Sequence, residues 1–386
     1  MGITRALSDA RALPGYPRAR RWQYTRPSKS PRDSRDMTAS QLPYLIGLLV
    51  ALFVVVRLIV RQLNGASGSP ADSEPETPTA SVATARPAMT ASTRTVRNAP
   101  VPATAVASWG YQLQNLDLDN AARSPFDILV IDPTLDGSDA TALKPADLAR
   151  LQHKSDGSRR LILAYLSIGE AESYRPYWDK QWKRTKPEWL LGENPEWKEN
   201  YAVCFWHPGW QSVICGSPEA RLDRVLAAGF DGVYLDKCDV YADLKRKYKA
   251  QVAGRPDIEG DMVQFISALS AYAKARNPAF QVVMQNAEDL LDRSELRACL
   301  DGVAKEELVY GGDGPEKLNS QDDFNDCREK LDLMRRDGKR VLVVEYLDDQ
   351  RKINHASEIV GPLGFVLYVS PKNRHLDRLN YQMVDA

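Results

Sequence analysis

The 386-residue chain lacks the features that mark several common classes of protein. It has 51 Lys and Arg against 51 Asp and Glu, so it has no basic excess to neutralise phosphates. This balance argues against nucleic acid as a partner. No G-x-G-x-x-G follows the first expected strand and no Walker loop occurs, so nucleotide binding has no support. No internal repeat is recognisable.

Motifs for metals and for serine nucleophiles are also missing. The four histidines lie far apart, with no H-E-x-x-H and no Asp-rich loop, so we expect neither a metal site nor a cofactor. A Ser-His-Asp triad would lack its usual G-x-S-x-G elbow. The five cysteines form no C-x-x-C and no zinc spacing. Cys204 and Cys215 could form a disulfide in an exported domain, or could be unpaired core thiols.

One long apolar run stands near the N-terminus, after a basic tail over residues 1–41. Residues 42–60 are apolar except for Arg57, a length that suits a signal anchor or a long signal peptide. We favour an uncleaved transmembrane anchor. The basic residues just upstream predict that the N-terminus stays inside and that the C-terminal domain is exported, either membrane-anchored or secreted. If translation starts at Met37, those upstream basic residues are absent and charge no longer predicts this orientation.

The rest of the chain divides into a linker and one large domain. Residues 61–107 are rich in Ala, Ser, Thr and Pro, which predicts a disordered, flexible linker. Over residues 108–386, Val/Ile/Leu-rich runs alternate with helical patterns at 144–153, 218–228, 260–276 and 322–337, which indicates parallel βα units. We predict strands at 109–113, 128–132, 161–167, 232–236, 281–286, 302–306, 340–346 and 364–369. Eight such strands predict an α/β fold of the (β/α)8 TIM barrel type, with a doubly wound sheet as the alternative.

Acidic residues stand at or just after the carboxyl ends of several predicted strands, where the chemistry of TIM barrels takes place. The clearest is Asp236, which ends the motif FDGVYLD over residues 230–236; the alternative is a helix N-cap. Glu306 and Glu307 follow each other, so only one of them can point inward. The apparent end of the strand favours Glu306, and the alternative is a solvated pair on a loop.

Further polar and aromatic residues complete what we predict to be an acidic sugar-binding cleft. Gly169 would let a ligand approach the backbone. The aromatic-rich residues 174–210 could stack on sugars, but we favour a small core of their own, with 206–210 as the most ligand-like piece. Substrate contacts are expected from Asp132, Tyr165, Ser167, Glu170, Lys237, Asp239, Asn286, Glu288, Glu307, Glu345 and Tyr346.

From Trp109 onward the chain resembles glycoside hydrolase family 114, the endo-α-1,4-polygalactosaminidase barrels. The motifs that carry this resemblance are WGYQLQ (109–114), YLSIGEAE (165–172), FDGVYLD (230–236), QNAE (285–288) and VAKEEL (303–308). The resemblance implies a (β/α)8 enzyme that cuts α-1,4-linked polymers of galactosamine and N-acetylgalactosamine. It also implies Asp236 and Glu306 as the catalytic acids, although Glu307 makes the second position a Glu-Glu pair.

The residues themselves also favour a carboxylate pair, the machinery that glycoside hydrolysis uses directly. We assign Asp236 as nucleophile or base and Glu306 as general acid, and we expect the acid's pKa to be raised by burial and a nearby carboxylate. Galactosamine units are cations that an acidic cleft would attract. The alternatives are a non-catalytic, envelope-tethered carbohydrate-binding barrel, an envelope scaffold that docks a protein partner, and a hydrolase of another glycan. The sequence leaves the stereochemical outcome and the oligomeric state open.

Overall fold

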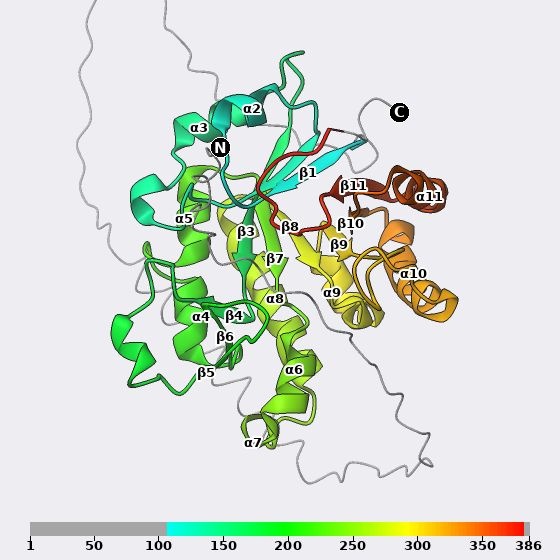
Figure 1. Ribbon diagram of the computed structural model, residues 1–386. Coiled ribbons are helices and arrows are strands. Elements are labelled where there is room, and N and C mark those ends of the chain that lie inside the picture. Colours follow the sequence, from blue (N-terminus) through cyan, green and yellow to red (C-terminus); the bar gives the residue numbers. More distant parts are fainter. Residues whose placement is uncertain (1–105, 382–386) are drawn as a thin grey trace, which may run out of the picture. The chain divides into compact units, whose positions relative to one another are not determined.

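The computed structural model describes residues 106–381 (Figure 1). The predicted basic tail, the apolar run at 42–60 and the linker up to residue 105 lie outside the described residues. Between residues 106 and 381 the structure has no helix with the length and apolar character needed to cross a membrane.

Eight parallel strands form the central sheet, in the order β1-β2-β3-β7-β8-β9-β10-β11. All eight predicted strands are present: β1 Trp109–Gln112, β2 Ile128–Ile131, β3 Leu161–Ser167, β7 Gly232–Asp236, β8 Gln281–Gln285, β9 Gly302–Glu306, β10 Arg340–Tyr346 and β11 Val366–Ser370. The first and last strands meet where Trp109 Nε1 donates to the carbonyl of Val366 at 2.9 Å. The sheet is therefore a nearly closed barrel, which confirms the TIM-like fold and rules out the doubly wound sheet.

Side chains fill the inside of the barrel. Successive residues of a strand point to opposite faces, so alternate positions of β1, β7 and β11 face inward. Trp109 packs on the rings of Tyr111, Tyr234 and Tyr368, with centroids 5.6–6.2 Å apart, and all four side chains are buried. The barrel is therefore a packed core rather than a pore, and a substrate must bind at one end of it.

Helices surround the barrel (Figure 1). The four predicted helices are confirmed within a few residues as α3 Pro145–Leu151, α5 Arg221–Ala228, α8 Ile258–Arg276 and α10 Gln321–Arg336. The others are α2 Leu118–Arg123, α4 Pro208–Ile214, α6 Val240–Lys247, α7 Lys249–Val252, α9 Ser294–Cys299 and α11 Gln350–Val360. Short 3-10 turns are η2 Asp139–Thr141, η3 Lys180–Lys183, η4 Glu288–Asp292 and η5 Gly361–Leu363. Helix α5 ends at Gly229, whose positive φ of 93° favours glycine, and β7 follows directly.

The aromatic-rich insertion after β3 builds a small sheet whose buried side chains join the hydrophobic core of the barrel. Strands β4 Glu170–Glu172, β5 Leu190–Glu193 and β6 Asn200–Val203 pair antiparallel in the order β4-β6-β5. Trp189 packs against Trp182 and Trp210, and Trp210 Nε1 donates to the carbonyl of Ile168 at 2.8 Å. The aromatic rings of this segment therefore serve packing, as we favoured, but they extend the barrel core and do not form a separate one.

The piece expected to be most ligand-like, residues 206–210, is used for packing instead. Trp210 is fully buried, and His207 Nδ1 accepts from the Gly209 amide at the start of α4. The guanidinium of Arg255 covers the Trp206 ring at 4.4 Å. Cys204 and Cys215, the candidate disulfide, are free thiols in this structure.

A C-terminal strap, residues 371–381, closes the seam between β11 and β1 (Figure 1). The carbonyl of Leu376 accepts from the amides of Leu113 and Gln114 just after β1. Asn380 Nδ2 donates to the carbonyl of Val369 on β11 at 2.9 Å. The strap therefore hydrogen-bonds to both strands that border the seam.

Candidate active site

Asp236 lies at the carboxyl end of β7, held by two hydrogen bonds. Its Oδ2 accepts from the Tyr165 hydroxyl at 2.7 Å and its Oδ1 from the amide of Lys237 at 2.7 Å. Tyr165 is positioned by β3, which pairs with β7 so that Tyr165 lies opposite Tyr234. The N-cap of the next helix, α6, is Asp239, so the N-cap alternative for Asp236 is wrong.

The pKa of Asp236 is raised from 3.8 to about 7. Burial is the largest cause because it penalises the charged form, and the negative charge of Glu306 is the second. Lys237 and the Tyr165 hydroxyl act in the opposite direction. The raised pKa thus falls on the residue to which the sequence argument gave the nucleophile role.

Glu306, at the end of β9, is the second inward-facing acid. Its Oε1 accepts from the Tyr346 hydroxyl of β10. Asn286, just after β8, donates from Nδ2 to Oε2 at 3.0 Å, while its own Oδ1 accepts from the Glu306 amide at 3.1 Å. Three neighbouring strands therefore fix this carboxylate, and of the two consecutive glutamates it is Glu306 that meets the inward-facing Tyr346.

The backbone is strained directly beside both acids. Lys237, Asn286, Ala287 and Glu307 have φ between 53° and 59°, in the left-handed region that non-glycine residues seldom adopt. They follow the ends of β7, β8 and β9. Strain of this kind concentrates at functional sites, where surrounding contacts hold it in place.

Glu307 forms an ion pair with a residue that the sequence analysis did not predict, Arg374. Arg374 belongs to the strap, and its guanidinium also lies 5.3 Å from the centre of the Tyr346 ring. Arg374 therefore contacts the same tyrosine that holds Glu306. It stands in a segment without helical or strand periodicity, so no sequence signal marked it.

Asp132 also stands at a strand end, but an arginine neutralises it. Arg175 Nη1 and Nη2 donate to its two oxygens at 2.9 and 2.6 Å, and the Thr134 hydroxyl donates at 2.6 Å. Arg175 Nε also binds Glu172 at 2.8 Å. Both acids are buried with Arg175, so in this structure Asp132 belongs to an internal ion network.

Five more of the predicted contact residues form a charged cluster beside Asp236. Glu170 Oε1 accepts from Asn194 Nδ2 at 2.8 Å and lies 3.3 Å from Lys237 Nζ, while its buried Oε2 has no partner among the described residues. Ser167 Oγ donates to the Glu170 carbonyl at 3.0 Å.

The cluster continues toward β9. Lys305 pairs with Glu288 at 3.1 Å. Asp239 lies near both lysines, and its pKa is raised, chiefly by burial. The structure therefore brings Ser167, Glu170, Lys237, Asp239 and Glu288 to the same end of the barrel as Asp236.

Gly169 serves packing rather than ligand approach. A Cβ at this position would lie 2.1 Å from the Lys237 carbonyl and 2.7 Å from the Val240 side chain. The expectation that Gly169 admits a ligand is therefore wrong. The glycine lets the turn after β3 press against the turn that follows Asp236.

Glu345 does not reach the mouth of the barrel. It is fully buried, and its oxygens accept from the amides of Val309 at 2.7 Å and Tyr310 at 3.2 Å. Burial raises its pKa to about 8. Its neighbour Tyr346 faces inward, so Glu345 must face the opposite side of β10. The expectation that Glu345 contacts the substrate is therefore wrong. Its carboxylate instead fixes the loop after β9 by accepting two backbone hydrogen bonds.

No set of three or more His, Cys, Asp or Glu side chains between residues 106 and 381 is arranged to bind a metal ion. Two tyrosine-held carboxylates at one end of a barrel can instead carry out acid and nucleophilic or base chemistry on a bound sugar.

Comparison with known proteins agrees with this geometry. The chain is 37% identical to an uncharacterised protein of Methanocaldococcus jannaschii over 284 residues, 70% of this chain and 78% of that protein. It is 36% identical to one of Deinococcus radiodurans over 279 residues, 71% of this chain and 83% of that protein. Its fold is similar to the glycoside hydrolase domain of PelA from Pseudomonas aeruginosa, with a TM-score of 0.52 and 19% identity over 71% of this chain and 97% of that domain. The model of glycoside-hydrolase family GH114 matches residues 89–384, and the chain belongs to that family.

Proposed function

We propose that the chain is an endo-acting glycoside hydrolase that cleaves α-1,4-linked galactosamine and N-acetylgalactosamine polysaccharide. The observation that carries the proposal is the inward-facing pair Asp236 and Glu306, each held by a tyrosine hydroxyl at the carboxyl end of the barrel. The family membership supports hydrolysis of a glycosidic bond. The choice of an amino sugar follows the sequence resemblance and the local charge.

In this mechanism one acid protonates the leaving oxygen while the other attacks the anomeric carbon or activates water. The pair must then hold one proton and one negative charge at the same time. A pKa of about 7 for Asp236 allows the pair to share one proton at neutral pH. With Asp236 as nucleophile or base and Glu306 as general acid, that proton has to reside on Glu306 when the substrate is bound.

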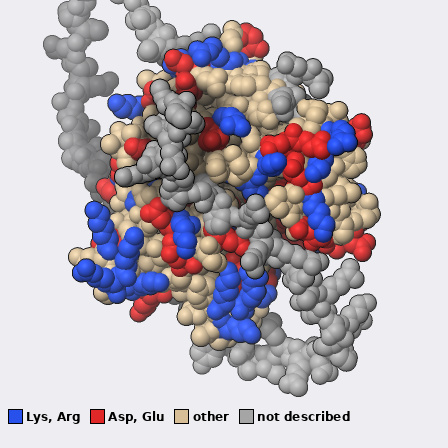
Figure 2. Space-filling model, viewed as in Figure 1, with Lys and Arg blue, Asp and Glu red and all other residues tan. Residues whose placement is uncertain are grey.

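The charge that would attract a cationic polymer is local to the mouth. The viewed face carries side chains of both signs, and basic residues gather over α6 (Figure 2), which has Lys245, Arg246 and Lys247 in its last turn. Around the acid pair, six acidic side chains stand against three basic ones. They are Glu170, Asp236, Asp239, Glu288, Glu306 and Glu307 against Lys237, Lys305 and Arg374. A net negative site favours ammonium groups.

The test uses the full-length chain with partially deacetylated α-1,4-galactosamine polymer, and mass spectrometry of the products. Wild type and a surface control, Asp326→Asn on α10, should release oligosaccharides, while Asp236→Asn and Glu306→Gln should not. Polymer that is bound but not cut by wild type would refute hydrolysis and favour a binding barrel. Absence of both binding and cleavage would refute the amino-sugar substrate.

The two roles can be separated with an aryl glycoside whose leaving group needs no protonation. Loss of a general acid is then tolerated, whereas loss of a nucleophile or base is not. Glu306→Gln should keep substantial activity on this substrate and Asp236→Asn should have none. The reverse result would exchange the two roles.

We also infer that the barrel lies outside the cytoplasm, tethered through residues 42–60, where it trims or releases a surface polysaccharide. The support is the apolar run and the basic residues that precede it. Protease added to intact spheroplasts should degrade the barrel. A barrel that is protected until the cells are lysed would overturn this location.

A further inference from the structure

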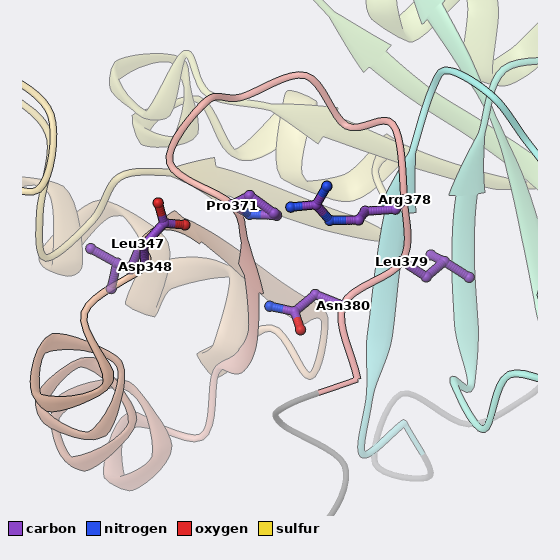
Figure 3. Close-up of a pocket in the computed structure, with 6 residues that line it drawn as sticks. All are labelled: Leu347, Asp348, Pro371, Arg378, Leu379 and Asn380. Atoms are coloured by element: carbon purple, nitrogen blue, oxygen red, sulfur yellow. The ribbon is translucent and has the colours of Figure 1, made fainter. Parts of the chain in front are cut away.

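A pocket of about 210 Å³ opens beside the strap, at the ends of β10 and β11 (Figure 3). It is about seven times the volume of a water molecule, which occupies roughly 30 Å³, and a single sugar ring fits such a space. Its lining residues are Leu347, Asp348, Pro371, Arg378, Leu379 and Asn380. Figure 3 shows Arg378 and Asn380 extending from the strap toward Pro371 and Asp348, whereas Leu379 points the other way.

Chain connectivity ties this pocket to the acid pair. Leu347 follows Tyr346, whose hydroxyl donates to Glu306. The strap that supplies Arg378 also supplies Arg374, which lies over the Tyr346 ring. The pocket and Glu306 therefore lie at the same carboxyl end of the barrel, linked through the end of β10 and the strap.

The charges in the pocket select among amino sugars. Asp348 is already paired, since Oδ1 accepts from the Lys372 amide at 3.2 Å and Oδ2 lies 3.3 Å from Lys372 Nζ. Arg378 has only a 4.0 Å contact with Asp377 among the residues described, and 64% of its side chain is exposed. A guanidinium is a fixed cation with several donors and no acceptor. It repels an ammonium group and can donate to a carbonyl or hydroxyl oxygen.

We propose that this pocket is an accessory subsite for one N-acetylated galactosamine unit, bound by Arg378 through its acetamido carbonyl oxygen. The proposal rests on the proposed function, because it places a second unit of the same polymer on the Glu306 side of the cleft. It assigns opposite preferences to two parts of the cleft. The acid pair attracts amines, and the strap pocket selects an acetylated unit.

Binding is measured by calorimetry on the full-length chain made inactive by Asp236→Asn. The probes are two hexasaccharides of α-1,4-linked galactosamine, one fully acetylated and one fully deacetylated. Arg378→Ala should lower the affinity for the acetylated probe about tenfold, which is the effect of losing one hydrogen bond from a charged donor. The affinity for the deacetylated probe should not fall. The matched control is Arg336→Ala on α10, whose side chain is 67% exposed and also paired with an acid.

Unchanged affinity for both probes in Arg378→Ala would overturn the subsite, and an equal loss for both would overturn its preference for an acetylated unit. Absence of binding of either probe to the chain with Arg378 intact would overturn it as an amino-sugar subsite. The acetylated probe could bind in an Arg378-dependent way while the chain with Asp236 intact cuts no polymer. That result would support the subsite and refute the proposed hydrolysis.

Discussion

Replacing Asp236 with Asn should make the folded protein more stable at alkaline pH. The pKa of this carboxyl is displaced from 3.8 to about 7 by burial and by Glu306, a shift of about 3 units. At about 1.4 kcal/mol per unit, ionising Asp236 in the folded state costs up to about 4 kcal/mol. Asn is neutral at every pH and removes that cost. It retains only one carbonyl-type acceptor, however, for the two donors Tyr165 and Lys237.

The direction in which stability changes with pH follows from the number of protons that each state binds. In the unfolded chain Asp236 ionises near pH 3.8, whereas in the folded chain it keeps its proton up to about pH 7. Between these values the folded state binds more protons, so the stability of wild type falls as the pH rises, and the full penalty is present above pH 7. The lost hydrogen bond in Asp236→Asn costs about 1–2 kcal/mol at any pH. The net gain should be about 2–3 kcal/mol at pH 8, with a small loss at pH 4.

Urea unfolding of the full-length chain at pH 4 and pH 8 measures this difference, with Asp326→Asn as an exposed control. The decisive quantity is the change in the free energy of unfolding between wild type and Asp236→Asn at each pH. If that change is the same at both pH values, Asp236 does not carry a raised pKa, and the proton-sharing argument fails.

Three further changes test contacts around the site. Tyr346→Phe removes the hydroxyl donor to Glu306 and should lower kcat on the polymer about ten- to a hundredfold, with little change in KM. Gly169→Ala places a methyl 2.1 Å from the Lys237 carbonyl and should lower the free energy of unfolding by about 2 kcal/mol or more. Arg175→Ala leaves two buried carboxylates without their cation and should cost about 3–5 kcal/mol in urea unfolding.

Matched controls separate these effects from general damage. Tyr381→Phe removes a hydroxyl that binds Asn120 and should leave kcat unchanged; a fall equal to that of Tyr346→Phe would contradict the specific role. A Cβ added at Gly254 would meet no atom of the described residues within 4 Å, so Gly254→Ala should be tolerated. Arg336 is exposed, so Arg336→Ala should lower the free energy of unfolding only slightly. If Arg175→Ala were as stable as wild type, the two buried carboxylates would need no cation.

The order and type of the main elements could be predicted from the sequence because they bury long apolar patterns. Several barrel strands, such as β2 Ile128–Ile131 and β3 Leu161–Ser167, are apolar runs that face both the core and the helices, which gives a continuous apolar signal. Helix α7 Lys249–Val252 has only four residues, about one turn, which is too short to show a helical period. The sheet of β4, β5 and β6 was missed because strands of three and four residues within an aromatic-rich segment give no alternation to read.

The candidate site shows where a pattern of acids at strand ends stops being informative. Strand alternation, applied to neighbours, could have shown that Glu345 and Tyr346 cannot both face the mouth. No such rule could reveal that Asp132 is neutralised, because Arg175 stands 43 positions away and comes into contact only through the tertiary fold.

Asp236 and Glu306 differ from Asp132 and Glu345 in the groups that bind their carboxylates. Their strong donors are neutral tyrosine hydroxyls and amides, not arginines. A carboxylate held by neutral groups can take up and release a proton, whereas one clamped by a guanidinium is fixed as an anion, so the partners of each acid, more than its place on a strand, single out the pair suited to catalysis.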